Sequence, residues 1–158
     1  MATLGNRPDL FGGSEYIGKY YTADYEKYEI PPEALEDAQF AAIIKEAEKY
    51  LGYPYIWGGS TPATSFDCSG FVYWCLNNSG VSQSYLTSSG WRSPGRYQKI
   101  TSFSDLRAGD IVVVSGHVGI CSGSGTVIDA SSSHGRVVER GLSSWWRSNF
   151  ICGWRIFG

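Results

Sequence analysis

The chain has 158 residues, enough for one domain with a sizeable hydrophobic core but too few for two ordinary domains. Hydrophobic residues make up 42% of it and charged residues 18%, which excludes a disordered chain. The formal net charge of -2 and the lack of a long apolar stretch argue against a nucleic-acid-binding module and a membrane-spanning protein. We therefore expect a globular monomer with neither nucleic acid nor a membrane as partner.

Residues 1–30 combine tyrosines, glycines and scattered charges without a clear period, and they are predicted to form a linker or surface arm. They lack the basic region and the apolar stretch of a secretory signal peptide. The chain is therefore expected either to be intracellular as it stands or to be a segment of a longer exported protein. The folded domain is predicted over residues 31–158.

Two helices are predicted in the first half of this domain. Pro31 is expected to open the first, because proline is tolerated in the first turn of a helix, and Gly52 is expected to end it. A loop rich in glycine, proline and threonine follows over residues 53–65. The second helix is predicted over residues 68–77, and residues 81–105 are predicted to be a long polar connection with one short helical turn.

From Gly109 onward the hydrophobic period changes to two, which predicts successive strands. A short helix, capped by Ser143 or Ser144, is expected before the last strand. Helices first and an antiparallel sheet second predict an α+β domain in which the N-terminal helices pack on the sheet. The predicted strands cover residues 111–114, 117–121, 126–130, 135–139 and 151–157.

Cys68 lies at the expected start of the second helix, between the polar residues Asp67 and Ser69. There a thiol is close to free backbone N–H groups at the positive end of the helix dipole, which favour the nucleophilic thiolate. The polar neighbours indicate a site that opens to solvent. A buried structural cysteine remains the alternative on local sequence alone.

The other three cysteines are interpreted as small buried hydrophobic residues. Cys68 and Cys75 are seven residues apart on one helix, about 10 Å at 1.5 Å per residue, too far for a disulfide. No spacing of Cys and His is typical of a zinc site. A metal site made from His117, Asp129 and a cysteine therefore has no support from spacing.

His117 supplies a candidate base on a predicted strand. If the hairpin that follows is centred on Gly123, His117 pairs with Asp129 and both side chains lie on one face of the sheet. A slip of one residue would move Asp129 to the other face, so the pairing is conditional. A carboxylate there would orient the imidazole and stabilise its protonated form. The competing histidine, His134, falls in a predicted turn, where a base is rarely held firmly.

Tyr55 lies upstream in a loop that is able to fold over the thiol. Its hydroxyl would then assist an oxyanion hole together with the Cys68 backbone N–H. Alternatively, Tyr55 is only packed in a turn, and the sequence alone does not distinguish this packing role from a role in the oxyanion hole.

Five motifs that follow one another along residues 38–157 resemble the NlpC family of bacterial cell-wall cysteine peptidases, which have a circularly permuted papain-like fold. Five motifs in the same order as in the family are far stronger evidence for the resemblance than a single motif. The chain is also similar to the C-terminal hydrolase domain of wall lysins from conjugative elements. The motifs are Gly52-x-Pro54-Tyr55-x-Trp57-Gly58-Gly59, Phe66-Asp67-Cys68-Ser69-Gly70-Phe71-Val72, Leu106-x-x-Gly109-Asp110-Ile111-Val112, His117-Val118-Gly119-Ile120 and Ile128-Asp129-Ala130-Ser131.

The resemblance implies roles for individual residues. Cys68 matches the family nucleophile, His117 the base, and Tyr55 the tyrosine that lines the site. Asp67 and Ser69 match positions that meet the free amino end of a bound stem peptide. The third catalytic position is commonly histidine in the family, and Asp129 occupies it here.

The implied reaction is hydrolysis of peptidoglycan stem peptides, typically between γ-D-glutamate and the following diamino acid, without a metal or organic cofactor. It implies work outside the cell membrane, in the wall, as part of a longer exported chain. Three alternatives remain open: a Cys-His acyltransferase or amidase with a non-wall substrate, a non-catalytic wall-binding module, and an interbacterial toxin with the same chemistry.

Overall fold

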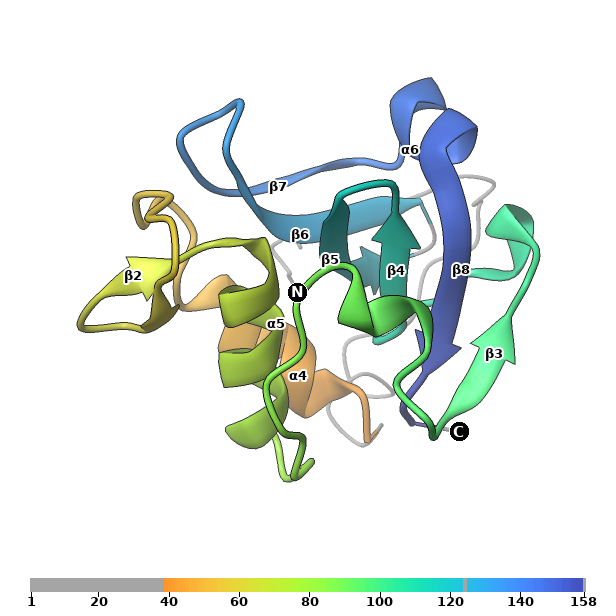
Figure 1. Cartoon of the computed structure of the whole chain (residues 1–158), viewed down its shortest axis with the longest axis horizontal. Helices are drawn as coiled ribbons and strands as arrows, with labels where there is room; N and C mark the ends of the chain where they lie inside the picture. The colour runs from red at the N-terminus through yellow and green to blue at the C-terminus, as the bar shows by residue number, and fades with distance from the viewer. Residues whose placement is uncertain (1–38, 124, 158) are drawn as a thin grey trace.

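The computed structural model describes residues 39–123 and 125–157. The predicted arm over residues 1–30 and the predicted helix start at Pro31 lie outside this part of the chain. The α+β prediction is confirmed: helices α4 (Ala41–Glu48) and α5 (Cys68–Asn77) precede a six-stranded antiparallel sheet (Figure 1). No helix in the described residues is long and apolar enough to cross a membrane.

The strand order of the sheet is β3-β8-β4-β5-β6-β7, and each neighbouring pair is antiparallel. The last strand therefore lies inside the sheet, between β3 and β4, while the others from β4 onward follow one another as a meander. The five strands predicted from the period of two are confirmed, with ends that differ by one or two residues. The strands are β3 (Gln98–Ile100), β4 (Ile111–Val114), β5 (His117–Gly123), β6 (Thr126–Ser131), β7 (Arg136–Gly141) and β8 (Phe150–Arg155).

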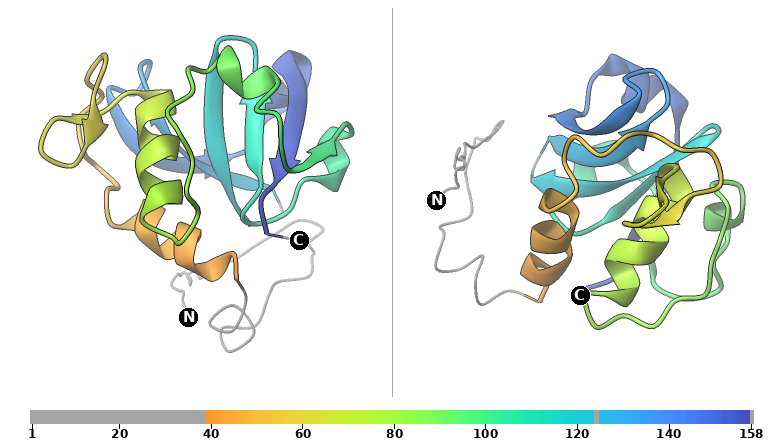
Figure 2. Two further views of the ribbon diagram at one scale, coloured as in Figure 1. Left: turned by 60° about the horizontal axis from the view of Figure 1, so that its bottom comes forward. Right: turned by 90° about the vertical axis from the view of Figure 1, so that its left-hand side faces the viewer.

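The two faces of the sheet carry two hydrophobic clusters, because successive strand side chains point to opposite faces. Ile111 and Val113 of β4 pack with α4 and α5, which lie together on one side of the sheet (Figure 2). Val112 and Val114 pack instead with Trp146 of the short helix α6 (Ser144–Asn149). A strand buried on both faces explains why residues 111–114 are continuously apolar.

Helices α4 and α5 are joined by a polar contact as well as by apolar packing. The Trp74 indole of α5 donates to Tyr50 Oη at 2.9 Å and to Glu46 Oε2 at 3.2 Å. Helix α4 ends at Glu48, before the predicted end at Gly52, because the next amides bond three residues back in a tightened last turn. The hydrogen bonds of Trp74 fix α5, and with it Cys68, against α4.

Two connections contain more regular structure than predicted. The loop over residues 53–65 holds a small hairpin, β1 (Ser60–Thr61) with β2 (Ser65–Phe66). The connection over residues 81–105 holds two short 3₁₀ turns and β3, which is stabilised by pairing with the distant β8. Strands of two or three residues give no readable period, so local pattern did not indicate them.

Candidate active site

Cys68 is the first residue of α5, as the sequence predicts. The helix is capped by Asp67, whose Oδ1 accepts a hydrogen bond from the Gly70 amide at 2.8 Å. The thiol therefore lies at the positive end of the helix dipole, beside the free N–H groups of the first turn. Cys68 is partly exposed, whereas the other three cysteines are buried, which confirms their interpretation as core residues. The four free thiols are Cys68, Cys75, Cys121 and Cys152.

The loop before α5 is pressed against the start of the helix. Asp67 Oδ2 accepts from the Gly58 amide at 3.0 Å, so one carboxylate ties the loop and the helix together. A Cβ on Gly70 would lie 1.9 Å from the Gly59 carbonyl oxygen, which is why glycine is required at this approach. The two glycine-containing motifs therefore form one structural unit around Cys68.

His117 and Asp129 are in direct contact, as the sequence predicts: Nε2 of the imidazole and Oδ2 of the carboxylate are 2.7 Å apart. The predicted strand register is wrong, however. Ile120 pairs with Ile128, so continuing the ladder by one residue places Gly119, rather than His117, opposite Asp129. The displacement is two residues, which keeps Asp129 on the same face, and His117 reaches it diagonally.

The surroundings of His117 favour its protonated form. Burial alone would lower the pKa of the imidazole, but hydrogen bonding to Asp129 and to Cys68, with their negative charges, outweighs burial and raises it from 6.5 to about 9. Because Asp129 engages Nε2, Nδ1 is the ring nitrogen left for the thiol. The imidazole of His117 is therefore protonated at neutral pH.

Arg140 of β7 completes this cluster, and the sequence reasoning missed it. Its guanidinium binds both oxygens of Asp129, with Nε to Oδ1 at 3.0 Å and Nη2 to Oδ2 at 2.6 Å. The indole rings of Trp145 and Trp146 in α6 pack against both His117 and Arg140. Their centres lie 6.2 and 5.5 Å from the centre of the His117 ring. They lie 5.8 and 5.0 Å from the guanidinium carbon of Arg140. Arg140 lies one residue beyond the strand predicted over residues 135–139, and its partner depends on the register between β6 and β7.

Tyr55, Asp67 and Ser69 lie around Cys68. Burial raises the pKa of the Tyr55 hydroxyl, and the negative charges of Cys68, Asp67 and Tyr85 raise it further. Asp67 and Ser69 are themselves buried, although Cys68 between them is partly exposed. The reason is that the Asp67 carboxylate caps the helix, while Ser69 Oγ hydrogen-bonds to Tyr85 Oη at 2.8 Å.

His134 lies apart from this cluster, in the turn between β6 and β7. Its Nδ1 is 2.9 Å from Ser131 Oγ, and the residue is exposed. The part of the chain that the structure describes contains no group of three or more His, Cys, Asp or Glu residues arranged to hold a metal ion.

The profile of the NlpC/P60 family matches residues 52–155, about two thirds of the chain and every residue of this cluster. The chain belongs to the NlpC/P60 family. One similar protein is the bifunctional muramidase/DL-endopeptidase CwlT of Bacillus subtilis (strain 168), 35% identical over 125 residues, which cover 74% of this chain and 36% of CwlT. Another is the gamma-DL-glutamyl hydrolase of the same organism, 34% identical over 114 residues, covering 67% of this chain and 27% of that protein.

Among solved structures, the NlpC/P60 domain of the peptidoglycan hydrolase SagA is similar to this chain with a TM-score of 0.59. The two are 32% identical, and the match covers 73% of this chain and 97% of the SagA domain. The expected α+β, papain-like fold is thereby confirmed. The chain spans about a third or less of the curated Bacillus relatives, so the comparison concerns this domain and not those whole proteins.

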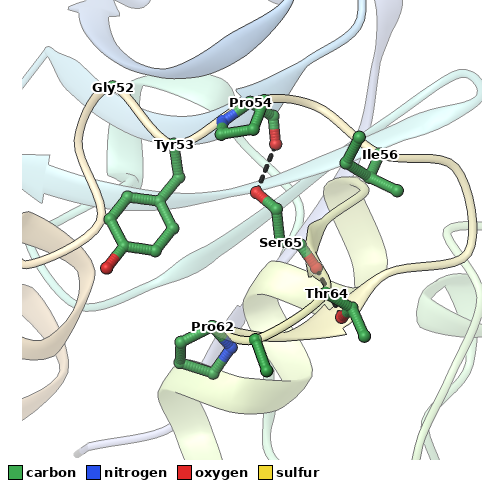
Figure 3. A pocket seen from close by; sticks show the side chains of 8 residues that line it. Gly52, Tyr53, Pro54, Ile56, Pro62, Thr64 and Ser65 are labelled. Atoms are coloured by element: carbon green, nitrogen blue, oxygen red, sulfur yellow. Dashed lines mark hydrogen bonds between the residues drawn. The ribbon is translucent and has the colours of Figure 1, made fainter.

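The NlpC/P60 domain also has an open pocket of about 420 Å³ in the loop between α4 and α5 (Figure 3). Its lining residues fall within residues 52–65, and the Ser65 hydroxyl, hydrogen-bonded to the Pro54 carbonyl, closes one side. None of the catalytic candidates lines it. Cys68, His117 and Asp129 are thus not part of this pocket.

Proposed function

We propose that this NlpC/P60 chain is a cysteine endopeptidase that hydrolyses peptidoglycan stem peptides at the bond between γ-D-glutamate and the diamino acid. The observation that carries the proposal is that Cys68, at the start of α5, hydrogen-bonds to His117. Nε2 of His117 in turn lies 2.7 Å from Oδ2 of the buried Asp129. This is the nucleophile, base and orienting group that acyl transfer through a thioester needs.

In the proposed reaction, the Cys68 thiolate attacks the γ-carbonyl carbon and forms a tetrahedral oxyanion. Because its pKa is about 9, His117 carries a proton at neutral pH and gives it to the leaving amine as the amide bond breaks. The thioester that remains is attacked by water, and the now neutral imidazole accepts the proton of that water. Asp129 keeps the ring orientation through both halves.

Two further roles follow from the positions around Cys68. The Cys68 backbone N–H belongs to the first turn, which the helix itself does not use, and together with the Tyr55 hydroxyl it would stabilise the oxyanion. Asp67 accepts hydrogen bonds from two backbone amides and, at 3.4 Å, from the Ser69 hydroxyl, whereas a carboxylate has about four acceptor positions. It therefore keeps the capacity to receive, with Ser69, the ammonium group of a stem peptide.

The names of the relatives support the same bond. CwlT is a DL-endopeptidase and the second relative a gamma-DL-glutamyl hydrolase, and a bond from γ-D-glutamate to an L-centred amine is of this DL type. Action on stem peptides places the work in the cell wall, which would require export as part of a longer chain.

The test is digestion of purified sacculi that contain either meso-diaminopimelate or lysine, followed by mass spectrometry of the released fragments. Cleavage on the carboxyl side of γ-D-glutamate should vanish in Cys68→Ala and His117→Ala. The matched control is His134→Ala, which removes the other histidine of the chain and should cleave like the wild type.

The chemotype that is digested identifies the preferred diamino acid. Cleavage at a different bond, or cleavage that persists in Cys68→Ala, would overturn the proposal. If neither chemotype is digested while Cys68 still reacts with iodoacetamide, the substrate is another acyl compound and the endopeptidase proposal fails.

A further inference from the structure

We propose that Arg140 is a positioning residue that holds Asp129 and offsets its charge, so that His117 is able to act as a base when the thioester is hydrolysed. The inference rests on the proposed cysteine hydrolysis and concerns a residue that neither the sequence motifs nor the printed names of the relatives point to.

The geometry is that of a planar, two-point ion pair. Nε and Nη2 of Arg140 reach one oxygen each of Asp129, at 3.0 and 2.6 Å, and Oδ2 also receives His117 Nε2 at 2.7 Å. Both carboxylate oxygens are therefore engaged, which fixes rotation of the carboxylate. Three adjacent strands, β5, β6 and β7, contribute one member each.

The pairing matters because Asp129 has no exposed surface. A buried carboxylate without a partner is costly, and its whole charge would act on the neighbouring imidazole. Arg140 supplies a compensating positive charge, and its side chain is only 25% exposed beneath the indole rings of α6. The charges of the carboxylate and the guanidinium then cancel.

The groups that act on His117 can be assigned to the elements packed around it. Helix α5 presents Cys68, β6 presents Asp129, β7 presents Arg140 through Asp129, and α6 presents the rings of Trp145 and Trp146. Before acylation, Cys68 and Asp129 both favour the imidazolium. Once Cys68 is a thioester its negative charge is gone, and Asp129 alone then opposes loss of the proton.

The two halves of the reaction therefore make opposite demands on His117. Proton donation to the leaving amine requires the imidazolium, whereas activation of water requires the neutral ring. An uncompensated Asp129 would serve the first step and hinder the second. Arg140 reduces the pull of Asp129, so that removal of the thiolate charge is enough to make the ring a base.

The first measurement is the pKa of His117 by NMR of the imidazole protons in wild type, Arg140→Met and Arg140→Lys. The chain has two histidines, so the signal that disappears in His134→Gln identifies His134 and leaves His117 assigned. Arg140→Met should raise the pKa of His117, whereas Arg140→Lys should leave it near the wild-type value. The control is Arg136→Met, which removes an exposed arginine from the same strand.

The second measurement is turnover of a soluble stem peptide at neutral pH. Each rise of one in the pKa of the acyl-enzyme imidazole reduces its neutral fraction about tenfold, so Arg140→Met should lower kcat up to about tenfold. KM should fall with kcat, and a Cys68-linked acyl-enzyme should accumulate in intact-mass spectra. Raising the pH should recover part of the lost rate. Arg140→Lys keeps the positive charge but lacks the two-point hold, so it should restore only part of the lost rate.

Failure of this inference is distinguishable from failure of the endopeptidase proposal. If wild type cleaves the peptide but Arg140→Met matches Arg136→Met in kcat, KM and His117 pKa, the role of Arg140 is refuted and the endopeptidase stands. A lowered His117 pKa in Arg140→Met would also refute it. If wild type cleaves no stem peptide, the NMR titration still decides whether Arg140 offsets Asp129.

Discussion

Gly119 lies next to Asp129 across the continued β5–β6 ladder, and it has no side chain that would crowd this residue. A Cβ on Gly119 would lie 2.8 Å from Val127 Cγ2, 3.2 Å from Asp129 Cβ and 3.3 Å from Trp146 Cη2. Contacts this short on three sides leave no direction in which the backbone can yield cheaply. The glycine of the His-Val-Gly-Ile motif therefore belongs to the site as much as its histidine does.

Gly119→Ala should displace Asp129 and weaken its hydrogen bond to His117. We expect a loss of activity of at least about tenfold and a fall in the free energy of unfolding of about 1–3 kcal/mol, the usual cost of overpacking. Urea unfolding and peptide turnover measure the two effects. Gly141→Ala is the matched control, because a Cβ there would meet its nearest neighbour at 3.9 Å. Equal behaviour of the two variants would contradict this account of Gly119.

The pH dependence of kcat/KM should have an alkaline limb near pH 9. The raised pKa of His117 means that the imidazolium persists below about pH 9 and is lost as the pH rises through that value. Asp129→Asn removes a negative charge beside the ring, so it should move this limb to lower pH. The control is Asp105→Asn, an exposed carboxylate outside the cluster. An unmoved limb in Asp129→Asn would mean that another group sets the pKa.

Asp67→Ala should destabilise the start of α5, because it removes the helix cap and the bond to the Gly58 amide. The expected loss is about 1–3 kcal/mol in the free energy of unfolding, measured in urea. Asp67→Asn keeps an acceptor for one of these amides and should lose less stability. If Asp67 also receives the substrate ammonium, Asp67→Asn should raise KM well beyond its effect on kcat. If Asp67→Asn lowers kcat and leaves KM unchanged, Asp67 does not bind the substrate ammonium and its role is structural.

Trp145→Ala should admit water to the ion pair between Arg140 and Asp129, because one of the two rings over it is removed. Trp145 is 46% exposed, so stability should change by less than about 1 kcal/mol while turnover falls several-fold. Trp145→Phe keeps a ring and should retain most of the activity. Thermal unfolding and peptide turnover, measured together, check this, and unchanged turnover in Trp145→Ala would remove Trp145 from the site.

The helix start at Cys68 was predictable because capping, dipole and motif are all local in sequence. The contact between His117 and Asp129 was predictable for a different reason: a register error of two residues preserves the face, so a wrong pairing still gave the right neighbours. The ion pair of Arg140 with Asp129 was not predictable, because the partner of Arg140 depends on how β6 pairs with β7. Local pattern carries no information on that register, and Arg140 pairs directly with Val127 while its side chain reaches Asp129.

The position of β8 between β3 and β4 has a consequence for synthesis on the ribosome. A nascent chain that ends before Phe150 already contains the thiol, the imidazole, the carboxylate and the guanidinium of the proposed site. It nevertheless lacks β8, the strand that lies between β3 and β4, so the facing backbone groups of β3 and β4 have no ladder partner. The residues of the proposed site are therefore synthesised before the strand that completes the sheet. We expect Cys68 to become ordered and reactive only after β8 has been added.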